Sequence, residues 1–411
     1  MAASRLQFGI RVPFWIAGIA IAAIANSATK STLDLSAGVG TSSNPSLRIG
    51  GESSVFGRFS ALGMHQWRSE RTTTSLSAFG ENTTYLRGYG SKQIFDLKAH
   101  SIHAVSPTLS IFGDLGFQGD FAGQLSNRFA SVAPDFNPPP SDQPAPVILN
   151  DPTLIGFGGR QYRLSGQAGL SLRANSRGTV SLSAGAQRNF ASASLRNANF
   201  NSYFGSASYD YQFNERTSAG FRSNFQYQDY DNGGSSSVIN PLLTVRRQFS
   251  DQLEGTAAAG LLLTRQHRLG GDSASSVDPS FSFSLCRVSD RDRFCGRASR
   301  DARNSLGVGF GPRAGSLVIS TSGGVDYSRR LDTNQSFQAS LSAVRYSSRL
   351  STGDDLRTTY LIFLTGYDRK IRQRLAVGVT AGARKLLQAG TDPKTDFTAT
   401  GYLRYRLGDI Q

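Results

Sequence analysis

The 411-residue sequence has no long apolar run after its first 25 residues, and only 38% of its residues are hydrophobic. Globular proteins usually contain about 45–50% apolar residues. A membrane protein made of helices needs stretches of about 20 apolar residues, so the rest of the chain does not belong to that class. A soluble enzyme of this length would need a large apolar core, which this composition does not supply.

Residues that commonly carry chemistry are also few, because the chain has two cysteines and four histidines. Two thiols are too few for a zinc or iron–sulfur site. His100 and His103, the two histidines that are close in sequence, would face opposite sides of a strand. The sequence has no Gly-x-Ser-x-Gly elbow, no phosphate-binding loop and no helix typical of DNA recognition. We therefore expect no enzyme activity, no metal or other cofactor, and no nucleic-acid partner.

The sequence is instead rich in glycine, with 44 residues, and it holds 26 Phe and 14 Tyr, which argues against disorder. From Thr32 onward, apolar and polar residues alternate in repeated segments. The clearest segment is 397–408, where one face carries Phe397, Ala399, Gly401, Leu403, Tyr405 and Leu407. Alternation over this length matches the 9–11 residues with which a strand crosses a bilayer. Strands can span lipid only as a closed barrel, because every backbone polar group needs a partner there.

The alternating segments predict an all-β transmembrane antiparallel β-barrel of about eighteen strands. Sixteen strands is the alternative count, because alternation is weakest in 42–92 and 294–314. Short polar turns alternate with longer connections, as periplasmic turns and extracellular loops do in bacterial barrels. The expected strands are 32–41, 53–68, 72–84, 93–105, 109–118, 161–174, 179–190, 200–213, 218–230, 236–249, 254–266, 279–288, 294–304, 315–328, 335–347, 357–369, 375–388 and 397–408.

Two segments fall outside this pattern. Residues 1–28 combine Arg5 and Arg11 with the apolar stretch 12–25 and a small-residue region, the order of a secretory signal peptide. Residues 29–411 would then form the barrel in the outer membrane of a Gram-negative cell. A retained membrane anchor is the alternative to the signal peptide, although the apolar stretch is short for a spanning helix, which needs about 20 residues. Segment 119–160 contains seven prolines, which no central strand tolerates. It predicts a long extracellular loop that either folds into the lumen or stays outside it.

The two cysteines, Cys286 and Cys295, flank the sequence Ser-Asp-Arg-Asp. If Asp290 and Arg291 form a two-residue turn, the cysteines lie directly opposite each other as a non-hydrogen-bonded pair. Such a pair brings the Cα atoms to about 4.5 Å, which is within disulfide range. The oxidising periplasm would permit the bond. Two free thiols remain the alternative.

Arginine accounts for most of the positive charge of the chain, whose formal net charge is +15. In a barrel, arginines on the polar faces of strands would point into a wet lumen and attract anions. Few acidic residues lie on the same polar faces, namely Asp210 and Asp326. Alternatively, these arginines pair with acids across strands and brace the wall. The candidate pore-lining residues are Arg163, Arg173, Arg222, Arg246, Arg384, Arg404 and Arg406, and we expect Arg222 and Arg384 to be wet.

A second group of arginines surrounds the cysteine hairpin. It could bind lipopolysaccharide phosphates or a partner, although a run of solvated charge explains it equally simply. The group consists of Arg287, Arg291, Arg293, Arg297, Arg300 and Arg303.

The segments YDYQFNERTSAG (209–220) and VDYSRRLDTNQSFQASL (325–341) resemble the outer-membrane β-barrel proteins that accompany exopolysaccharide and exosortase systems of proteobacteria. The resemblance implies a role in passing or anchoring secreted polysaccharide. Two functions are therefore expected as alternatives. One is a porin-like conduit for an anionic solute or an acidic polysaccharide, and the other is a non-conducting structural or surface-anchoring barrel. The expected partners are outer-membrane lipid, lipopolysaccharide, an anionic polysaccharide and periplasmic export components.

Overall fold

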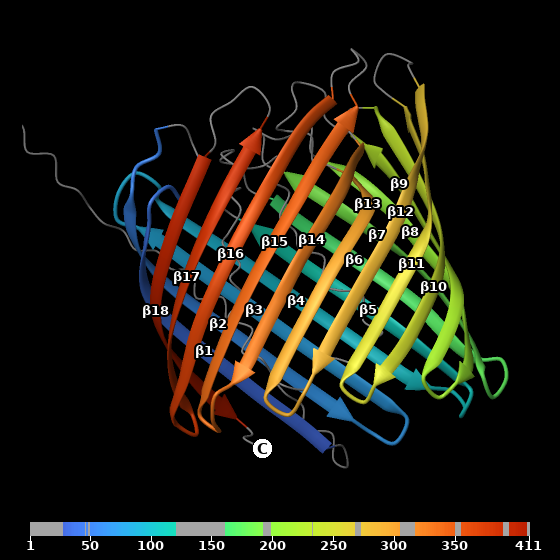
Figure 1. Cartoon of the computed structure of the whole chain (residues 1–411), viewed down its shortest axis with the longest axis horizontal. Helices are drawn as coiled ribbons and strands as arrows, with labels where there is room; N and C mark the ends of the chain where they lie inside the picture. Colours follow the sequence, from blue (N-terminus) through green and yellow to red (C-terminus); the bar gives the residue numbers. More distant parts are fainter. Residues whose placement is uncertain are drawn as a thin grey trace, which may run out of the picture.

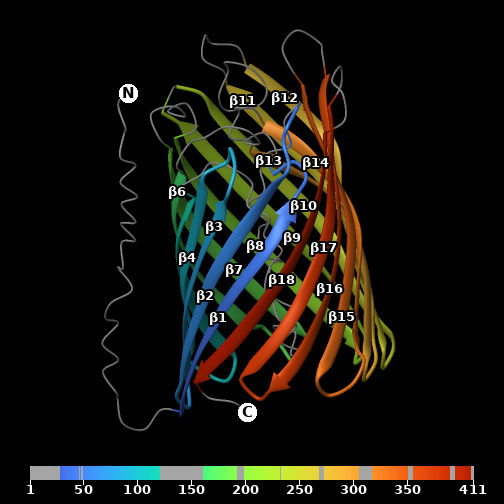
Figure 2. The same ribbon diagram turned by 90° about the vertical axis from the view of Figure 1, so that its left-hand side faces the viewer.

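The computed structural model describes residues 28–45, 47, 50–120, 161–191, 199–231, 233–267, 273–304, 317–349, 355–388 and 394–408. These residues form one antiparallel sheet of 18 strands. The sheet closes on itself because β1 pairs with both β2 and β18 (Figures 1 and 2). The predicted fold class is confirmed, and the alternative count of sixteen strands is wrong. Within the described ranges, no helix is long and apolar enough to cross a bilayer.

The strands are 12 to 18 residues long and lie tilted across the barrel wall (Figure 1). A tilted strand needs only about 9–11 residues to cross a bilayer, so most strands extend beyond it. The strands are β1 Ala28–Ser42, β2 Ser54–Arg68, β3 Thr72–Tyr85, β4 Ser91–Ala104, β5 Leu109–Asp120, β6 Gln161–Arg173, β7 Gly178–Ala191, β8 Phe200–Asn214, β9 Thr217–Tyr230, β10 Ser235–Ser250, β11 Leu253–His267, β12 Ser273–Val288, β13 Asp292–Asn304, β14 Leu317–Arg330, β15 Gln335–Arg349, β16 Asp355–Arg372, β17 Leu375–Gln388 and β18 Lys394–Gly408.

These bounds differ from the expected ones by a few residues at most ends, and by six at the start of β12. Ala28, which we assigned to the signal peptide, is the first residue of β1. Residues 1–27 lie outside the described part of the chain. Gly119 and Asp120 end β5, and the remainder of the proline-rich segment, 121–160, also lies outside the described residues.

One end of the barrel, here called the turn end, carries only tight connections of two to four residues, such as 215–216 and 331–334. Local hydrogen bonds shape them: Asn175 Oδ1, for example, accepts from the backbone N–H groups of Arg177 and Gly178 at 2.9 and 2.6 Å. The longer connections all lie at the opposite, loop end. Because short turns face the periplasm in bacterial barrels, the turn end is assigned to the periplasmic side.

The outward face of the wall is apolar. On β18, Phe397 and Leu403 are 63% and 47% exposed, whereas the inward-facing Thr398 and Thr400 are buried. Lipid would cover such an exposed apolar band. Aromatic side chains edge the band near both ends, as in membrane barrels. Those near the turn end are Trp67, Phe213, Phe249, Phe294 and Tyr327, and those near the loop end are Phe117, Tyr162, Phe190, Tyr203 and Tyr227.

The inward face divides into two halves. In the half next to the loop end it carries a ring of buried apolar side chains, called here the lumenal apolar belt. In the half next to the turn end, inward residues such as Met64, Arg173 and Arg222 are exposed. The belt consists of Phe56, Tyr85, Ile94, Phe200, Tyr230, Val238, Leu262, Val318, Tyr346, Tyr360 and Leu386.

Two neighbouring residues of β11 can test which face of the wall contacts lipid and which faces the lumen. Ala258 faces the lumen and its neighbour Ala259 faces outward near mid-strand. Replacing Ala259 with Arg places a charge in the hydrocarbon layer, and we expect a loss of about 2–4 kcal/mol of unfolding free energy. Ala258→Arg, the matched control, should cost much less. Equilibrium urea unfolding in phospholipid vesicles measures both, and equal losses would contradict this assignment of faces.

Candidate functional site

The candidate site is the lumenal wall. The strand register places all seven candidate arginines on inward faces, between exposed outward neighbours such as Leu164, Phe221 and Val245. They do not form one cluster, because they are distributed over β6, β9, β10, β17 and β18. Their surroundings decide what each can do.

Four of the seven arginines are paired with carboxylates on other strands, three of them on an adjacent strand and Arg404 across β17. Arg406 donates two hydrogen bonds of 2.7 Å to Asp34, which joins β18 to β1 across the closure seam. Arg246 Nε lies 2.6 Å from Glu254 Oε1, and a nitrogen of Arg404 lies 3.8 Å from Asp368. Arg384 pairs with Asp396. For these four residues the structure shows cross-strand bracing.

The sequence reasoning missed the acids in these pairs, Asp34, Glu254, Asp368 and Asp396. It had counted Asp210 and Asp326, of which Asp326 pairs with Arg297. A signal was present for Asp34, Glu254 and Asp368, since each stands on the polar face of an expected strand, whereas Asp396 precedes the expected strand 397–408. Which arginine an acid meets depends on the register between strands, and this is not readable from one strand alone.

Two candidate arginines, Arg173 on β6 and Arg222 on β9, are exposed to the lumen and have no ion pair with the described residues. Arg163 is half-buried between Gln118 and Asn189 of the adjacent strands. An exposed guanidinium that is not paired with a carboxylate can bind an anion that enters the lumen.

Between the charges, the wall is lined by hydroxyl and amide groups that bond across strands. Ser183 and Ser206 are joined at 2.7 Å, as are Ser299 and Ser322. Gln226 Nε2 donates to Ser202 Oγ at 3.2 Å. Such groups both donate and accept hydrogen bonds, so they can exchange partners with water or with a hydroxylated solute.

Arg384 differs from the other candidates because it is only 4% exposed. Its partner Asp396 is fully buried and accepts a hydrogen bond from Ser42 Oγ at 2.7 Å and from the Asn44 backbone N–H at 2.9 Å. Arg384 also donates to the carbonyl of Pro45 at 3.4 Å. The expectation that Arg384 is wet is therefore wrong: the pair is an anchor for the chain that follows β1.

This anchored segment, residues 42–45 and 47, is called here the inner strap. Leu47 is 1% exposed and packs against Tyr360, Leu386 and Ile362 on the inner side of β16 and β17. Its φ of 49° lies in the left-handed region, which costs a non-glycine residue of order 1 kcal/mol or more. Burial of the Leu47 side chain against the lumenal apolar belt offsets that cost.

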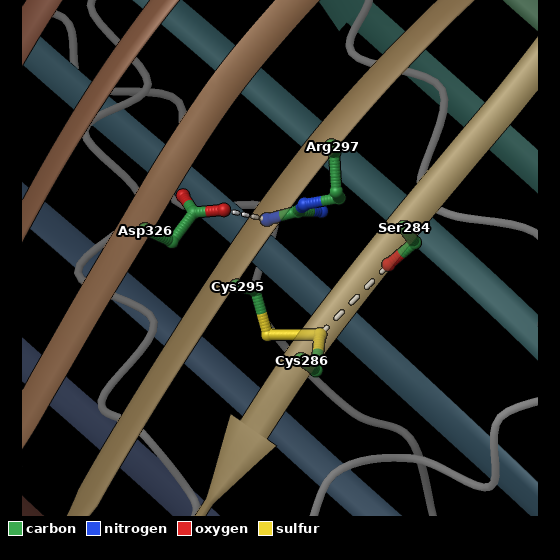
Figure 3. Close-up of a disulfide and its surroundings, with 5 residues drawn as sticks. All are labelled: Ser284, Cys286, Cys295, Arg297 and Asp326. Atoms are coloured by element: carbon green, nitrogen blue, oxygen red, sulfur yellow. Dashed lines mark hydrogen bonds and ion pairs between the residues drawn. A yellow bond between two sulfur atoms is a disulfide. The ribbon is translucent and has the colours of Figure 1, made fainter. Parts of the chain in front are cut away.

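The cysteine hairpin contains a disulfide between Cys286 on β12 and Cys295 on β13 (Figure 3). The register pairs the two residues directly, with their Cα atoms 4.1 Å apart. The Ser289 N–H donates to the Asp292 carbonyl at 2.7 Å and closes the tight turn. Ser284 Oγ lies 3.8 Å from Cys286 Sγ, on the same inward side as the Arg297–Asp326 pair.

The arginines around the hairpin do not form one group. Arg287 lies on the outward face, whereas Arg293 and Arg297 lie on the inward face. Arg300 pairs with Asp278 at 3.4 Å in the half of the barrel next to the loop end. The side chain of Arg303 lies outside the described residues. The hairpin turn itself lies at the turn end of the barrel.

No family model matches the chain, and no curated protein matches it. Solved structures with a similar shape include OccK2 (OpdF) of Pseudomonas aeruginosa, with 14% identity and a TM-score of 0.49 over 93% of this chain and 98% of that one. The FrpB iron transporter of Neisseria meningitidis (F3-3 variant) has 7% identity and a TM-score of 0.48, with coverages of 92% and 82%. A bacterial polysaccharide outer membrane secretin has 11% identity and a TM-score of 0.37, with coverages of 92% and 98%.

At these identities and TM-scores, the likeness carries no information on what the lumen holds. The closed sheet, the apolar outward band and its aromatic edges decide the class of protein. The chain is an outer-membrane β-barrel.

The disulfide of this barrel should protect both cysteines from alkylation. We expect a maleimide reagent to leave the purified, unreduced protein unlabelled in denaturant and to label two thiols after reduction. Mass spectrometry counts the adducts. Stoichiometric labelling without reductant would rule the bond out.

The buried anchor should matter more to stability than an exposed pair. Arg384→Gln leaves Asp396 buried without its counter-charge, and we expect a loss of about 3–5 kcal/mol of unfolding free energy. The matched control, Arg246→Gln, removes one partner of an exposed pair and should cost about 0–1 kcal/mol. Equilibrium unfolding in lipid vesicles measures both variants. Similar losses would show that the strap does not depend on the buried pair.

Proposed function

We propose that this outer-membrane barrel is a conduit for an anionic solute, and that its cargo is a secreted acidic polysaccharide. The observation that carries the proposal is the exposed lumenal wall near the turn end. There, Arg173 and Arg222 are exposed and form no ion pair with the described residues. A low-dielectric wall that holds unneutralised positive charge raises the local concentration of anions.

The polysaccharide part of the proposal is supported by the uncharged groups of the wall. Rows of serine hydroxyls, such as Ser183 with Ser206 and Ser299 with Ser322, match the hydroxyl groups of a sugar in kind. A wall with many equivalent, weak hydrogen-bonding sites holds a chain in place without trapping it, as conduction requires. The resemblance of 209–220 and 325–341 to barrels of exopolysaccharide systems points the same way.

A second candidate function, a non-conducting structural barrel, is favoured by the loop end. An open aqueous channel would be lined by exposed polar side chains. The inward faces near the loop end are instead buried, and they include the lumenal apolar belt. The inner strap, anchored by Arg384 and Asp396, inserts Leu47 against this belt. On this alternative, the lumen is closed at the loop end and the barrel anchors other components.

Single-barrel conductance separates the two candidates. The purified protein is inserted into planar bilayers under a KCl gradient, and the reversal potential gives the anion-to-cation permeability ratio. A conduit predicts stable, anion-selective steps. A barrel that stays closed at all voltages and salt concentrations leaves the structural function in its place.

The variant Arg222→Gln tests whether Arg222 sets the anion selectivity of the lumen. Removing one unpaired charge from a screened aqueous lumen should lower the permeability ratio by roughly twofold. The matched control is Arg247→Gln, which removes the same charge from the outward face of β10, where it cannot act on the lumen directly. If both variants keep the wild-type ratio, Arg222 does not set the selectivity.

A further inference from the structure

The charge at the turn end is unevenly distributed around the rim. Three consecutive turns, between β12 and β13, β14 and β15, and β16 and β17, carry far more basic than acidic side chains. The acids there are Asp290, Asp292 and Asp332. The basic residues, called here the basic arc, are Arg287, Arg291, Arg293, Arg329, Arg330, Arg369, Lys370, Arg372 and Arg374.

Backbone hydrogen bonds join the three turns into a continuous rim along the lower edge of the barrel (Figure 1). The Arg330 N–H donates to the Arg291 carbonyl at 2.7 Å, and the Lys370 N–H donates to the Asn334 carbonyl at 2.7 Å. On the far side, the Arg406 N–H donates to the Arg374 carbonyl at 2.8 Å. Neighbouring turns are two strands apart, or about 10 Å, so the rim presents positive charge at regular intervals.

The acids of these turns are partly occupied within the turns themselves. Asp292 accepts a hydrogen bond from Tyr327 at 2.9 Å and lies 3.6 Å from Arg329 Nε. Asp332 Oδ1 accepts from the Asn334 backbone N–H at 2.6 Å. The positive charge of the arc is therefore only partly compensated by its own acids.

The basic arc has an outer and an inner edge. Arg287, Arg329 and Arg369 lie on outward faces, where the phosphates of the inner leaflet would contact them. Five other members are exposed and have no ion pair with the described residues: two of them, Arg293 and Lys370, face the lumen on the inner edge, and the rest stand at the turns. These five residues, called here the mouth cations, are Arg291, Arg293, Lys370, Arg372 and Arg374. Arg330 also faces inward but is half-buried.

The opposite side of the rim is different. Its turn 105–108 has no charged residue, and the turns 69–71 and 215–216 each carry one acid beside one arginine. Arg216, for example, lies 3.4 Å from Asp251. The electrostatic field at the mouth is therefore strongest on one side, next to the exposed half of the lumen.

We propose that the mouth cations form a docking surface for an acidic polysaccharide, which enters the barrel from the periplasm. This assignment of the ligand rests on the proposed function. Guanidinium groups bind carboxylates with two parallel hydrogen bonds, and several weak contacts on one polymer add through multivalency. The Cys286–Cys295 disulfide cross-links the hairpin that carries Arg291 and Arg293, so two of the cations are presented on a constrained element.

A polysaccharide fits the mouth cations better than an acidic protein does. Stable protein interfaces depend on buried aromatic or large apolar anchors. Two exposed apolar residues of the turns, Leu331 and Ile371, continue the outward faces of their strands, whereas Val288 lies on the inner edge opposite Arg293. The inner edge offers mainly charge and hydrogen-bond donors, and it continues into the hydroxyl-lined wall.

The test measures polymer binding separately from conduction. Full-length protein in zwitterionic nanodiscs is titrated with fluorescent polygalacturonate, and neutral dextran serves as the uncharged probe. The test variant combines Arg291→Gln, Arg293→Gln, Arg372→Gln and Arg374→Gln. The matched control removes four charges from the opposite side of the rim: Arg68→Gln, Arg71→Gln, Arg177→Gln and Arg216→Gln.

We expect the wild type to bind polygalacturonate in a salt-sensitive manner and not to bind dextran. The test variant should lose about tenfold in affinity, and the control less than about threefold. Equal losses in the two variants would show unspecific attraction and overturn the proposal. Equal binding of polyglutamate, with the same dependence on the mouth cations, would overturn the assignment to polysaccharide in favour of an acidic protein.

Two further outcomes separate this proposal from its rivals. If the test variant binds polygalacturonate like the wild type but loses preference for anionic over zwitterionic nanodiscs, the mouth cations serve phospholipid and the proposal is wrong. Planar-bilayer recordings on the same preparations test the conduit independently. An anion-selective barrel that does not bind the polymer contradicts only the docking surface, whereas a closed barrel that binds it contradicts only the conduit.

Discussion

The closure of the sheet is the constraint on which the rest of the structure depends. In a bilayer, an unpaired backbone N–H or C=O group has no water to bond to, so a sheet with free edges is not stable there. The seam between β1 and β18 removes both edges, with paired residues running from Thr32 and Gly408 to Ser42 and Thr398. Side chains reinforce the seam near both ends: Asp34 meets Arg406 near the turn end, and Ser42 meets Asp396 near the loop end.

Closure also creates an inner surface whose composition the chain can vary along its length. Near the turn end this surface is polar and exposed, with arginines, hydroxyls and amides. Near the loop end it is buried, and the apolar side chains of the lumenal apolar belt alternate there with buried polar ones such as Asn189 and Gln228. The inner strap is fixed in this half by a buried ion pair. The lumen therefore has an exposed polar half on the periplasmic side and a buried half at the loop end. A conduit would need an open path through the buried half, whereas a structural barrel would keep it closed.

Positive charge serves different purposes at different depths of the lumen. Arg384 is buried and holds the strap, while Arg246 and Arg406 connect adjacent strands. Arg404 reaches across β17 to Asp368 on β16. Such pairs leave little net field in the lumen. The field that a mobile anion would meet comes from the arginines without carboxylate partners, on the wall and along the basic arc. The net charge of the chain therefore does not predict the field in the lumen, because nearby carboxylates neutralise many of the arginines.

The fold class, a count of sixteen to eighteen strands and the face on which each candidate arginine lies could be predicted from the sequence, because strand alternation has a period of two and is readable locally. The disulfide was equally accessible, since its cysteines belong to one hairpin and a two-residue turn sets their register. Which charges meet could not be predicted, because it depends on contacts between strands that are distant in the chain. Asp34 and Arg406 are 372 positions apart in the chain and become neighbours only when the barrel closes. The burial of Arg384 likewise depends on the inner strap, whose path into the lumen follows from packing between distant strands rather than from any local pattern.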